Sequence, residues 1–176
     1  GAFVRLTGAP FHEVAELLAR VGLAERIQAP TTAISLPELR RLEFARALTC
    51  QTMLRYYIQH DLRWQDEAYN VAWAGRENWL IMRGDVALGY VSLSRDARAL
   101  YIRELHVLEA FQRQGAGSWA IDQVFAMARK ERRPALRLTV FENNPARALY
   151  ERKGLKVVGT DDCFLRMQRE IDGVPR

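Results

Sequence analysis

A short loop with two glycines, placed between an apolar strand and a long amphipathic helix, constrains this 176-residue chain more than any other feature. The segment runs from Val107 to Ser118, and Gly115 and Gly117 stand two residues apart. Glycine lets the main chain approach a ligand closely, and the N-terminus of a helix presents free N–H groups and a positive dipole end. The sequence therefore predicts a pyrophosphate cradle formed mainly by the main chain.

Three strands joined by tight turns are expected before this loop. Polar and apolar residues alternate there with a period of two, which is typical of half-buried strands. The expected strands are Trp79–Met82, Val86–Leu93 and Ala99–Val107, with turns at Gly84-Asp85 and Ser94–Arg98. Short turns between consecutive strands predict an antiparallel meander that leads directly into the loop.

The residues before the meander have mostly helical patterns. Thr49–His60 and Trp64–Ala74 each place apolar side chains along one side of a helix. Leu39–Arg46 permits a strand or a helix, and we favour a first strand. Residues 1–35 are interpreted as an N-terminal helical extension, with a helical pattern between Pro10 and Ile27. That helix would pack on the main domain, form a homodimer contact or act as a lid.

The residues after the loop predict a helix, a strand, a second helix and a hairpin. In order, these are a helix to about Arg132, a strand at Leu136–Phe141, a short helix from Asn144-Pro145 to Gly154, and a hairpin of Val157–Gly159 and Phe164–Gln168. Asparagine and proline suit a helix N-terminus, and glycine suits a left-handed C-cap. Because a helix crosses between them, the strand at Leu136–Phe141 should run parallel to Ala99–Val107.

Two better-known phosphate motifs fit the loop less well. Residues Gly115 to Ala120 also satisfy G-x-G-x-x-G/A, the dinucleotide-binding fingerprint. That fingerprint belongs to alternating parallel strands and helices with an acidic residue about 20 positions later, whereas here an antiparallel meander comes first. A P-loop is excluded because no Gly-Lys-Ser/Thr sequence follows.

The charge balance does not identify a partner by itself. A net charge of +5 and a pI near 9.6 are compatible with an anionic ligand or with a nucleic-acid surface. The basic residues between Arg129 and Arg133 suit the C-terminal end of a helix. They lack the interleaved aromatic residues of a nucleic-acid surface, so we do not expect nucleic acid as a partner.

The cysteine and hydropathy patterns bear on metals and on location. The chain has two cysteines, Cys50 and Cys163, no CxxC pair and three histidines, so no metal site is expected. Two free thiols in a reducing, cytoplasmic compartment are the expectation. The sequence contains no run of about 18 apolar residues, so no membrane span is expected. The N-terminus also lacks the pattern of a signal peptide.

Two motifs follow one another in the order of a known family. Val107 is followed by Gln112-Arg113-Gln114-Gly115-Ala116-Gly117, and a second motif later comprises Asn143, Ala146, Tyr150, Gly154 and Leu155. They resemble the acetyl-CoA motif Arg/Gln-x-x-Gly-x-Gly/Ala and the later motif Asn-x-x-Ala-x-x-x-Tyr-x-x-x-Gly-Phe of the GNAT superfamily of N-acetyltransferases. The resemblance covers about residues 38–170. It departs from the family at Glu109, where proline is common, and at Leu155, where phenylalanine is usual.

This resemblance implies a fold and an activity. The implied α/β (α+β) fold has a mixed, mostly antiparallel central sheet with helices on both faces, over residues 36–176. A V-shaped splay would separate the fourth and fifth strands, counting the first near residue 42. The implied activity is acetyl transfer from acetyl-CoA to a primary amine, on a small molecule or a protein, by direct attack. A non-catalytic acyl-CoA-binding regulatory domain is the alternative.

The resemblance also implies roles for particular residues. Tyr150 would protonate the departing thiolate. Glu104 is the candidate general base, with His106 as the second candidate, since a spacing of two puts both on one side of a strand. Main-chain groups would hold the pyrophosphate and the pantetheine arm. The expected cofactor-binding residues are His106, Val107, Gln112, Arg113, Gln114, Gly115, Ala116, Gly117, Ser118 and Asn143.

An aromatic stretch between residues 56 and 79 is the candidate acceptor pocket. Its rings are Tyr56, Tyr57, Trp64, Tyr69, Trp73 and Trp79, and its acidic residues are Asp61, Asp66 and Glu67. A cationic amine would suit an aromatic, acidic pocket. Ordinary core packing with solvated helix ends is the alternative.

Overall fold

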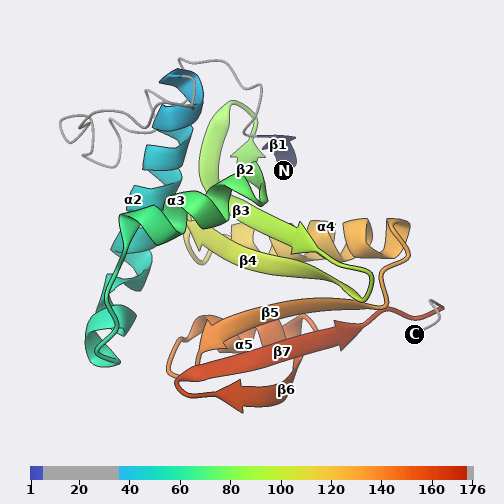
Figure 1. Ribbon diagram of the computed structural model, residues 1–176. Helices are drawn as coiled ribbons and strands as arrows, with labels where there is room; N and C mark the ends of the chain where they lie inside the picture. The colour runs from blue at the N-terminus through green and yellow to red at the C-terminus, as the bar shows by residue number, and fades with distance from the viewer. Residues whose placement is uncertain (6–35, 174–176) are drawn as a thin grey trace.

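The computed structural model describes residues 1–5 and 36–173, and Figure 1 shows how their elements are arranged. In chain order these are β1 (Ala2–Arg5), α2 (Leu36–Gln59), α3 (Asp66–Ala74), β2 (Glu77–Arg83), β3 (Val86–Arg95), β4 (Ala99–Val107), the 3-10 turn η1 (Glu109–Phe111), α4 (Ala116–Lys130), β5 (Ala135–Phe141), α5 (Ala146–Arg152), β6 (Lys156–Asp161) and β7 (Phe164–Glu170). The helix expected between residues 10 and 27 lies outside the described residues.

The strands form one seven-stranded sheet in the order β1-β2-β3-β4-β5-β7-β6. All neighbours are antiparallel except β4 and β5, which are parallel and joined through α4. Helices α2 and α3 cover one face of the sheet, and α4 and α5 cover the other (Figure 1). The predicted fold class, meander, parallel strand and final hairpin are therefore confirmed.

The prediction of a strand at Leu39–Arg46 is wrong, because this segment belongs to the 24-residue helix α2. Leu42, Ala45 and Thr49 are buried at the spacing of one helical face, with Phe44 and Leu48 beside them. Leucine, arginine, glutamate and alanine are also good helix formers. The edge strand next to β2 is instead β1, which pairs with β2 from Ala2↔Met82 to Arg5↔Trp79.

Among the described residues, three hydrophobic clusters hold the sheet between its helices, and the smallest packs Ala116 and Ala120 of α4 against Ile81 and Leu88. The largest cluster packs Ile121 and Val124 of α4 and Tyr150 of α5 against the strands. The second packs Phe44 and Leu48 of α2 against β2 and β3. Burying such side chains contributes about 1.5–3 kcal/mol each, so both helical layers are fixed to the sheet.

Strands β4 and β5 separate along their length. They pair only where Ala99–Ile102 lies beside Ala135–Leu138, and Figure 1 shows them diverging beyond that point. On its other side, β4 stays paired with β3 up to Val107. The predicted V-shaped splay is therefore present, and main-chain groups of β4 beyond Ile102 face an opening rather than a strand.

Two local features shape β4 at this opening. Leu93 pairs with Ile102 and Ser92 with Glu104, so Arg103 is the extra residue of a β-bulge. Bulges bend a strand, increase its twist and are frequent beside functional sites. Further along, a Cβ atom at Gly89 would stand 2.0 Å from the carbonyl oxygen of His106. Glycine at position 89 therefore lets β3 approach β4 closely behind His106.

Two negative findings concern the described part of the chain. Within residues 1–5 and 36–173, no helix is both long and apolar enough to cross a membrane. In the same ranges, no three His, Cys, Asp or Glu side chains gather in a way that could hold a metal ion.

Candidate active site

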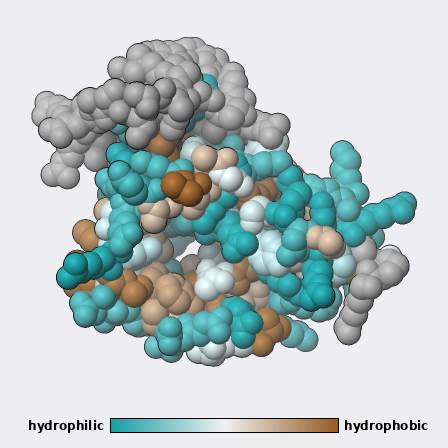
Figure 2. Space-filling view, viewed as in Figure 1, coloured by the Kyte–Doolittle hydropathy of each residue, from teal (hydrophilic) through white to brown (hydrophobic). Residues whose placement is uncertain are grey.

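The splay opens into a cleft of about 1030 Å³, lined by residues from α2, α3, β4, the glycine loop, β5 and α5. In the space-filling view of Figure 2, a hollow separates the half of the molecule that carries α2 and α3 from the half that carries β5 to β7. Residues from both motifs and from the candidate acceptor region meet in this one cleft.

The glycine loop has the backbone shape expected of an anion cradle. Arg113 and Gly115 both have left-handed φ angles, of 59° and 87°. Helix α4 begins directly afterwards, Gly115 gives it no side-chain cap, and its first main-chain bond runs from Trp119 N to Gly115 O at 2.9 Å. The N–H groups of residues 116–118 are therefore left without intrahelical partners. Such groups at a helix N-terminus suit a phosphate.

Most of the loop residues predicted to bind the cofactor face the cleft. Its lining includes Gln112, Arg113, Gly115, Gly117 and Ser118. The Gln112 amide nitrogen also donates to the Val107 carbonyl oxygen at 3.0 Å. That hydrogen bond ties the loop to the end of β4.

Three predicted cofactor residues do not line the cleft. The Gln114 side chain instead donates to the Ala110 carbonyl at 2.9 Å, and Ala116 is buried. Asn143 donates to the Gln59 side chain at 3.0 Å, whereas its neighbour Asn144 lines the cleft. As predicted, Asn144 caps α5, since its Oδ1 accepts from Ala146 N at 2.9 Å.

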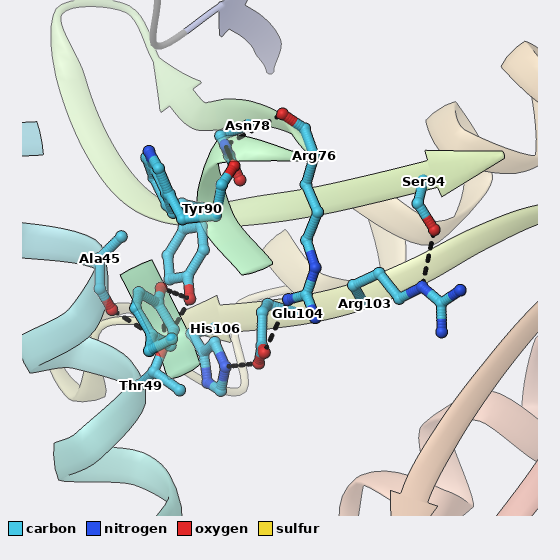
Figure 3. Close-up of polar contacts among 11 residues, drawn as sticks. Ala45, Thr49, Arg76, Asn78, Tyr90, Ser94, Arg103, Glu104 and His106 are labelled. Atoms are coloured by element: carbon cyan, nitrogen blue, oxygen red, sulfur yellow. Dashed lines mark hydrogen bonds and ion pairs between the residues drawn. The ribbon is translucent and has the colours of Figure 1, made fainter. Parts of the chain in front are cut away.

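Glu104 and His106 lie side by side on β4 in the cleft (Figure 3). Glu104 Oε2 lies 2.9 Å from His106 Nε2, and its Oε1 accepts from Arg76 at 3.2 Å. On the far side of the ring, Thr52 Oγ1 lies 2.7 Å from His106 Nδ1. A carboxylate and an unprotonated ring nitrogen are both acceptors. The Glu104–His106 contact therefore requires a proton between the two side chains.

A group of buried hydroxyls supports the histidine from behind. The Tyr90 ring stacks on the His106 ring with centroids 5.4 Å apart. Its hydroxyl lies 2.8 Å from that of Tyr69 and bonds to Thr49. Burial, first, and then neighbouring negative charge raise the pKa values of Tyr69 and Tyr90. Both phenols therefore remain neutral. Tyr90 packs against the imidazole ring, and Tyr69 hydrogen-bonds to Tyr90.

These supporting residues were not predicted from the sequence. Thr52 and His106 are 54 positions apart, and nothing in the local pattern relates them. One sequence feature could have indicated them. Thr49 and Thr52 are three residues apart, so they share one face of a helix, and that face is otherwise apolar. The predicted helix Thr49–His60 contains both threonines, but nothing in its sequence identifies the partner of either hydroxyl.

Tyr150 reaches the cleft from α5. It lines the cleft and is only 8% exposed. Burial, and secondly the negative charge of Glu104, raise the pKa of Tyr150 to about 12. The phenol therefore keeps its proton at neutral pH, and the acid and base candidates influence each other electrostatically.

The candidate acceptor region differs from its expected composition. Tyr56, Tyr57, Trp64 and Tyr69 line the cleft, whereas Trp73, Trp79, Asp61, Asp66 and Glu67 do not. For the three carboxylates the structure agrees with the alternative of solvated helix ends and not with an acidic pocket. The three carboxylates lie on the α2–α3 connection and the first turn of α3, where they are exposed. Among the described residues, Glu104 is the one carboxylate of the lining.

The comparisons with known proteins establish the family. The sequence profile described as "Acetyltransferase (GNAT) family" matches residues 37–155. The chain therefore belongs to the GNAT acetyltransferase family. No curated protein sequence matches the chain.

Solved structures share this fold at low sequence identity. One is a GNAT family acetyltransferase from Elizabethkingia anophelis with acetyl-CoA bound, with TM-score 0.55, 18% identity, and coverage of 61% of this chain and 84% of that one. A PaiA N-acetyltransferase from Thermoplasma acidophilum in complex with coenzyme A has TM-score 0.58, 17% identity, and coverage of 74% and 91%. An IAA acetyltransferase from Bacillus cereus has TM-score 0.53, 15% identity, and coverage of 60% and 85%.

Proposed function

We propose that this protein is an N-acetyltransferase that moves an acetyl group from acetyl-CoA to a primary amine by direct attack in a ternary complex. The observation that carries the proposal is one cleft holding an anion cradle, an unpaired strand edge, Glu104 and Tyr150. Its family and two CoA-containing structures of the same fold also support it.

The chain has suitable groups for the length of acetyl-CoA. The uncapped N-terminus of α4 and the left-handed residues Arg113 and Gly115 suit a pyrophosphate. The edge of β4 near His106 and Val107 can pair with the pantetheine amides as an added strand would. When bound, acetyl-CoA supplies a thioester carbonyl for the amine to attack. A main-chain N–H of this edge would stabilise the developing oxyanion.

Glu104 is the proposed general base. An alkyl amine has a pKa near 10 and arrives mostly as an ammonium ion, so it must lose a proton before attack. Glu104 is the carboxylate of the cleft lining and already shares a proton with His106. Arg76 and His106 fix the two carboxylate oxygens in place. The proton passes from the amine to this pair, either on the carboxylate or on the His106 ring.

Tyr150 is the proposed acid for the departing thiolate. With a pKa of about 12 it is a weaker acid than a thiol of pKa near 8.5. Part of that elevation comes from the charge of Glu104. Once Glu104 has taken up the proton of the amine, its charge no longer raises the pKa of Tyr150. The phenol therefore becomes a better donor in the step that needs it.

An amine-panel assay that follows thiol release from acetyl-CoA tests the proposal. The panel includes free amino acids, small amines and short peptides, and mass spectrometry identifies an added acetyl group. Acetyl transfer to at least one amine supports the proposal. A thermal shift with acetyl-CoA but no transfer to any amine would support the non-catalytic acyl-CoA-binding alternative instead.

A further inference from the structure

The charge of the cleft lining is predominantly positive. Within the part of the chain that the structure describes, the lining contains six arginines, Arg55, Arg63, Arg76, Arg103, Arg113 and Arg152, and one carboxylate, Glu104. Of these arginines, Arg76 is paired with Glu104. None of the other five forms an ion pair with a carboxylate of the described residues. Unpaired guanidinium groups around one cleft favour anionic ligands.

The arginines divide between the two ends of the cleft. Arg113 belongs to the glycine loop, and Arg152 belongs to α5. Leu149 of α5 would stand 3.3 Å from a Cβ atom at Gly117, so α5 lies beside the start of α4. Arg55 on α2, Arg63 after α2 and Arg103 on β4 come from the elements around Glu104 and the aromatic lining. The phosphates of a bound CoA would account for the first group. The second group is exposed and available to another anion.

The contacts of the second group leave donors available. Arg103 is the bulge residue of β4, and its Nε donates to Ser94 Oγ at 2.6 Å. Figure 3 shows its guanidinium turned along β4, away from the Glu104 carboxylate. Arg55 lies over the Tyr56 ring, 4.6 Å from its centroid, and its Nη2 donates to the Tyr56 hydroxyl at 2.5 Å. Arg63 is exposed. Each guanidinium thus retains N–H groups for a carboxylate or phosphate, which arginine binds in bidentate geometry.

We propose that the acceptor is a small primary amine that also carries an anionic group, an inference that rests on the proposed acetyltransferase function. The ammonium group lies at Glu104, the one negative charge of the lining. The anionic group lies against Arg55, Arg63 or Arg103. The rings of Tyr57, Trp64 and Tyr69 face the part of the acceptor between them. A polyamine would place its further positive charges against these arginines, so it is a poor acceptor.

Matched acceptor pairs test this selectivity. The pairs are 4-aminobutyrate with 4-aminobutanamide and phosphoethanolamine with ethanolamine, and spermidine serves as the polycationic amine. We expect the anionic member of at least one pair to have a kcat/KM about 10- to 100-fold higher than its neutral partner, the effect of one charged hydrogen-bonded contact. The pair that responds distinguishes a carboxylate from a phosphate.

Arginine variants locate the contact. Arg55→Gln, Arg63→Gln and Arg103→Gln are compared with Arg129→Gln, a change on the exposed surface of α4. At least one of the first three should raise the KM of the anionic acceptor about tenfold or more, with the dissociation constant of acetyl-CoA unchanged. The control should change neither value.

Three results would overturn the inference. These are equal or faster acetylation of the neutral partners, preference for spermidine, and variants that weaken acetyl-CoA rather than the acceptor. Acetylation of amines without regard to charge contradicts this inference and leaves the proposed function intact. Absence of transfer to every amine contradicts the proposed function itself.

Discussion

The two ends of the cleft are built in different ways. The cradle end is formed by one continuous segment, residues 112–118, and depends on φ angles and on main-chain N–H groups at the start of α4. The acceptor end is formed by side chains of α2, α3 and β4. Backbone shape is sufficient to hold a phosphate, whereas recognition of a particular acceptor depends on the side chains around it.

The two ends also differ in what holds them together. A tight turn and a helix start position the cradle locally. Glu104 and His106 depend on partners from other elements, namely Arg76 at 3.2 Å and Thr52 at 2.7 Å. A change at the cradle end should therefore abolish cofactor binding, whereas changes at the acceptor end should affect turnover and acceptor affinity.

Substitution of the second loop glycine should have the largest effect. Gly117 lines the cleft, and even a Cβ atom there would stand 3.3 Å from the Leu149 side chain. The ring of Gly117→Trp would therefore occupy the space where the main chain approaches a phosphate. We expect loss of acetyl-CoA binding by calorimetry, about 100-fold or more. Ala126→Trp, at an exposed position of the same helix, should bind normally. Normal binding by both variants would place the cofactor elsewhere.

Replacing the carboxylate should separate turnover from cofactor binding. Loss of a general base costs about 10²–10⁴-fold in rate, so Glu104→Gln should lower kcat by roughly 10³-fold. The dissociation constant of acetyl-CoA should stay within about twofold, because the cradle is formed by other residues. His106→Gln should also lower kcat, because it removes the shared proton. Steady-state kinetics with Glu109→Gln, an exposed carboxylate, provide the control. Undiminished kcat in Glu104→Gln would remove it as the base.

Tyr150→Phe should have a smaller effect, because sulfur is an adequate leaving group once partly stabilised. We expect kcat to fall by about 10²-fold, the lower end of general acid catalysis, with acetyl-CoA affinity nearly unchanged. Tyr101→Phe, a hydroxyl outside the cleft lining, should keep kcat. The pKa of about 12 places ionisation of Tyr150 above the usual assay range, so no alkaline loss of activity from this group should appear below pH 10. Equal kcat in the two variants would show that the phenol only packs.

Several elements were predictable from the sequence because local chemistry determines them. Alternating apolar residues predicted β2 to β4, and Gly154 has the predicted left-handed φ of 81°. The predicted strand at residues 99–107 has the bounds of β4. Leu39–Arg46 was misread because a short apolar segment fits both periods, and only its continuation to Gln59 makes it helical. β1 has four residues, too few for a pattern to appear.

The candidate site was also predictable where local sequence determines it. The motifs identify the glycine loop and Tyr150, and the strand before the loop supplies Glu104 and His106. These three side chains line the cleft together with the loop residues Gln112, Arg113, Gly115, Gly117 and Ser118. Asp61, Asp66 and Glu67 are close in sequence to the aromatic residues of the lining, but they lie at solvated helix ends outside the cleft. The five unpaired arginines come from α2, the α2–α3 connection, β4, the glycine loop and α5, so no linear pattern could bring them together.

The smallest predicted effect is on stability. It concerns Asp96 in the β3–β4 turn, at the closed end of the splay and outside both ends of the cleft. In the β3–β4 turn, Asp96 accepts a hydrogen bond from Tyr101 at 2.8 Å and from two main-chain N–H groups. The Tyr101 bond first, and then those N–H groups, hold the pKa of Asp96 below its ordinary value of 3.8. A folded-state pKa below the ordinary value stabilises the folded protein at pH values above the ordinary pKa. This stability is lost as the pH falls through the folded-state pKa.

Because Asp96 is exposed, Asp96→Asn should lower Tm by only about 1–3 °C at pH 7. Calorimetry should show the difference shrinking below about pH 4, while acetyl-CoA affinity and kcat stay unchanged. A Tm difference independent of pH would instead assign the effect to the turn's geometry rather than to the charge of its carboxylate.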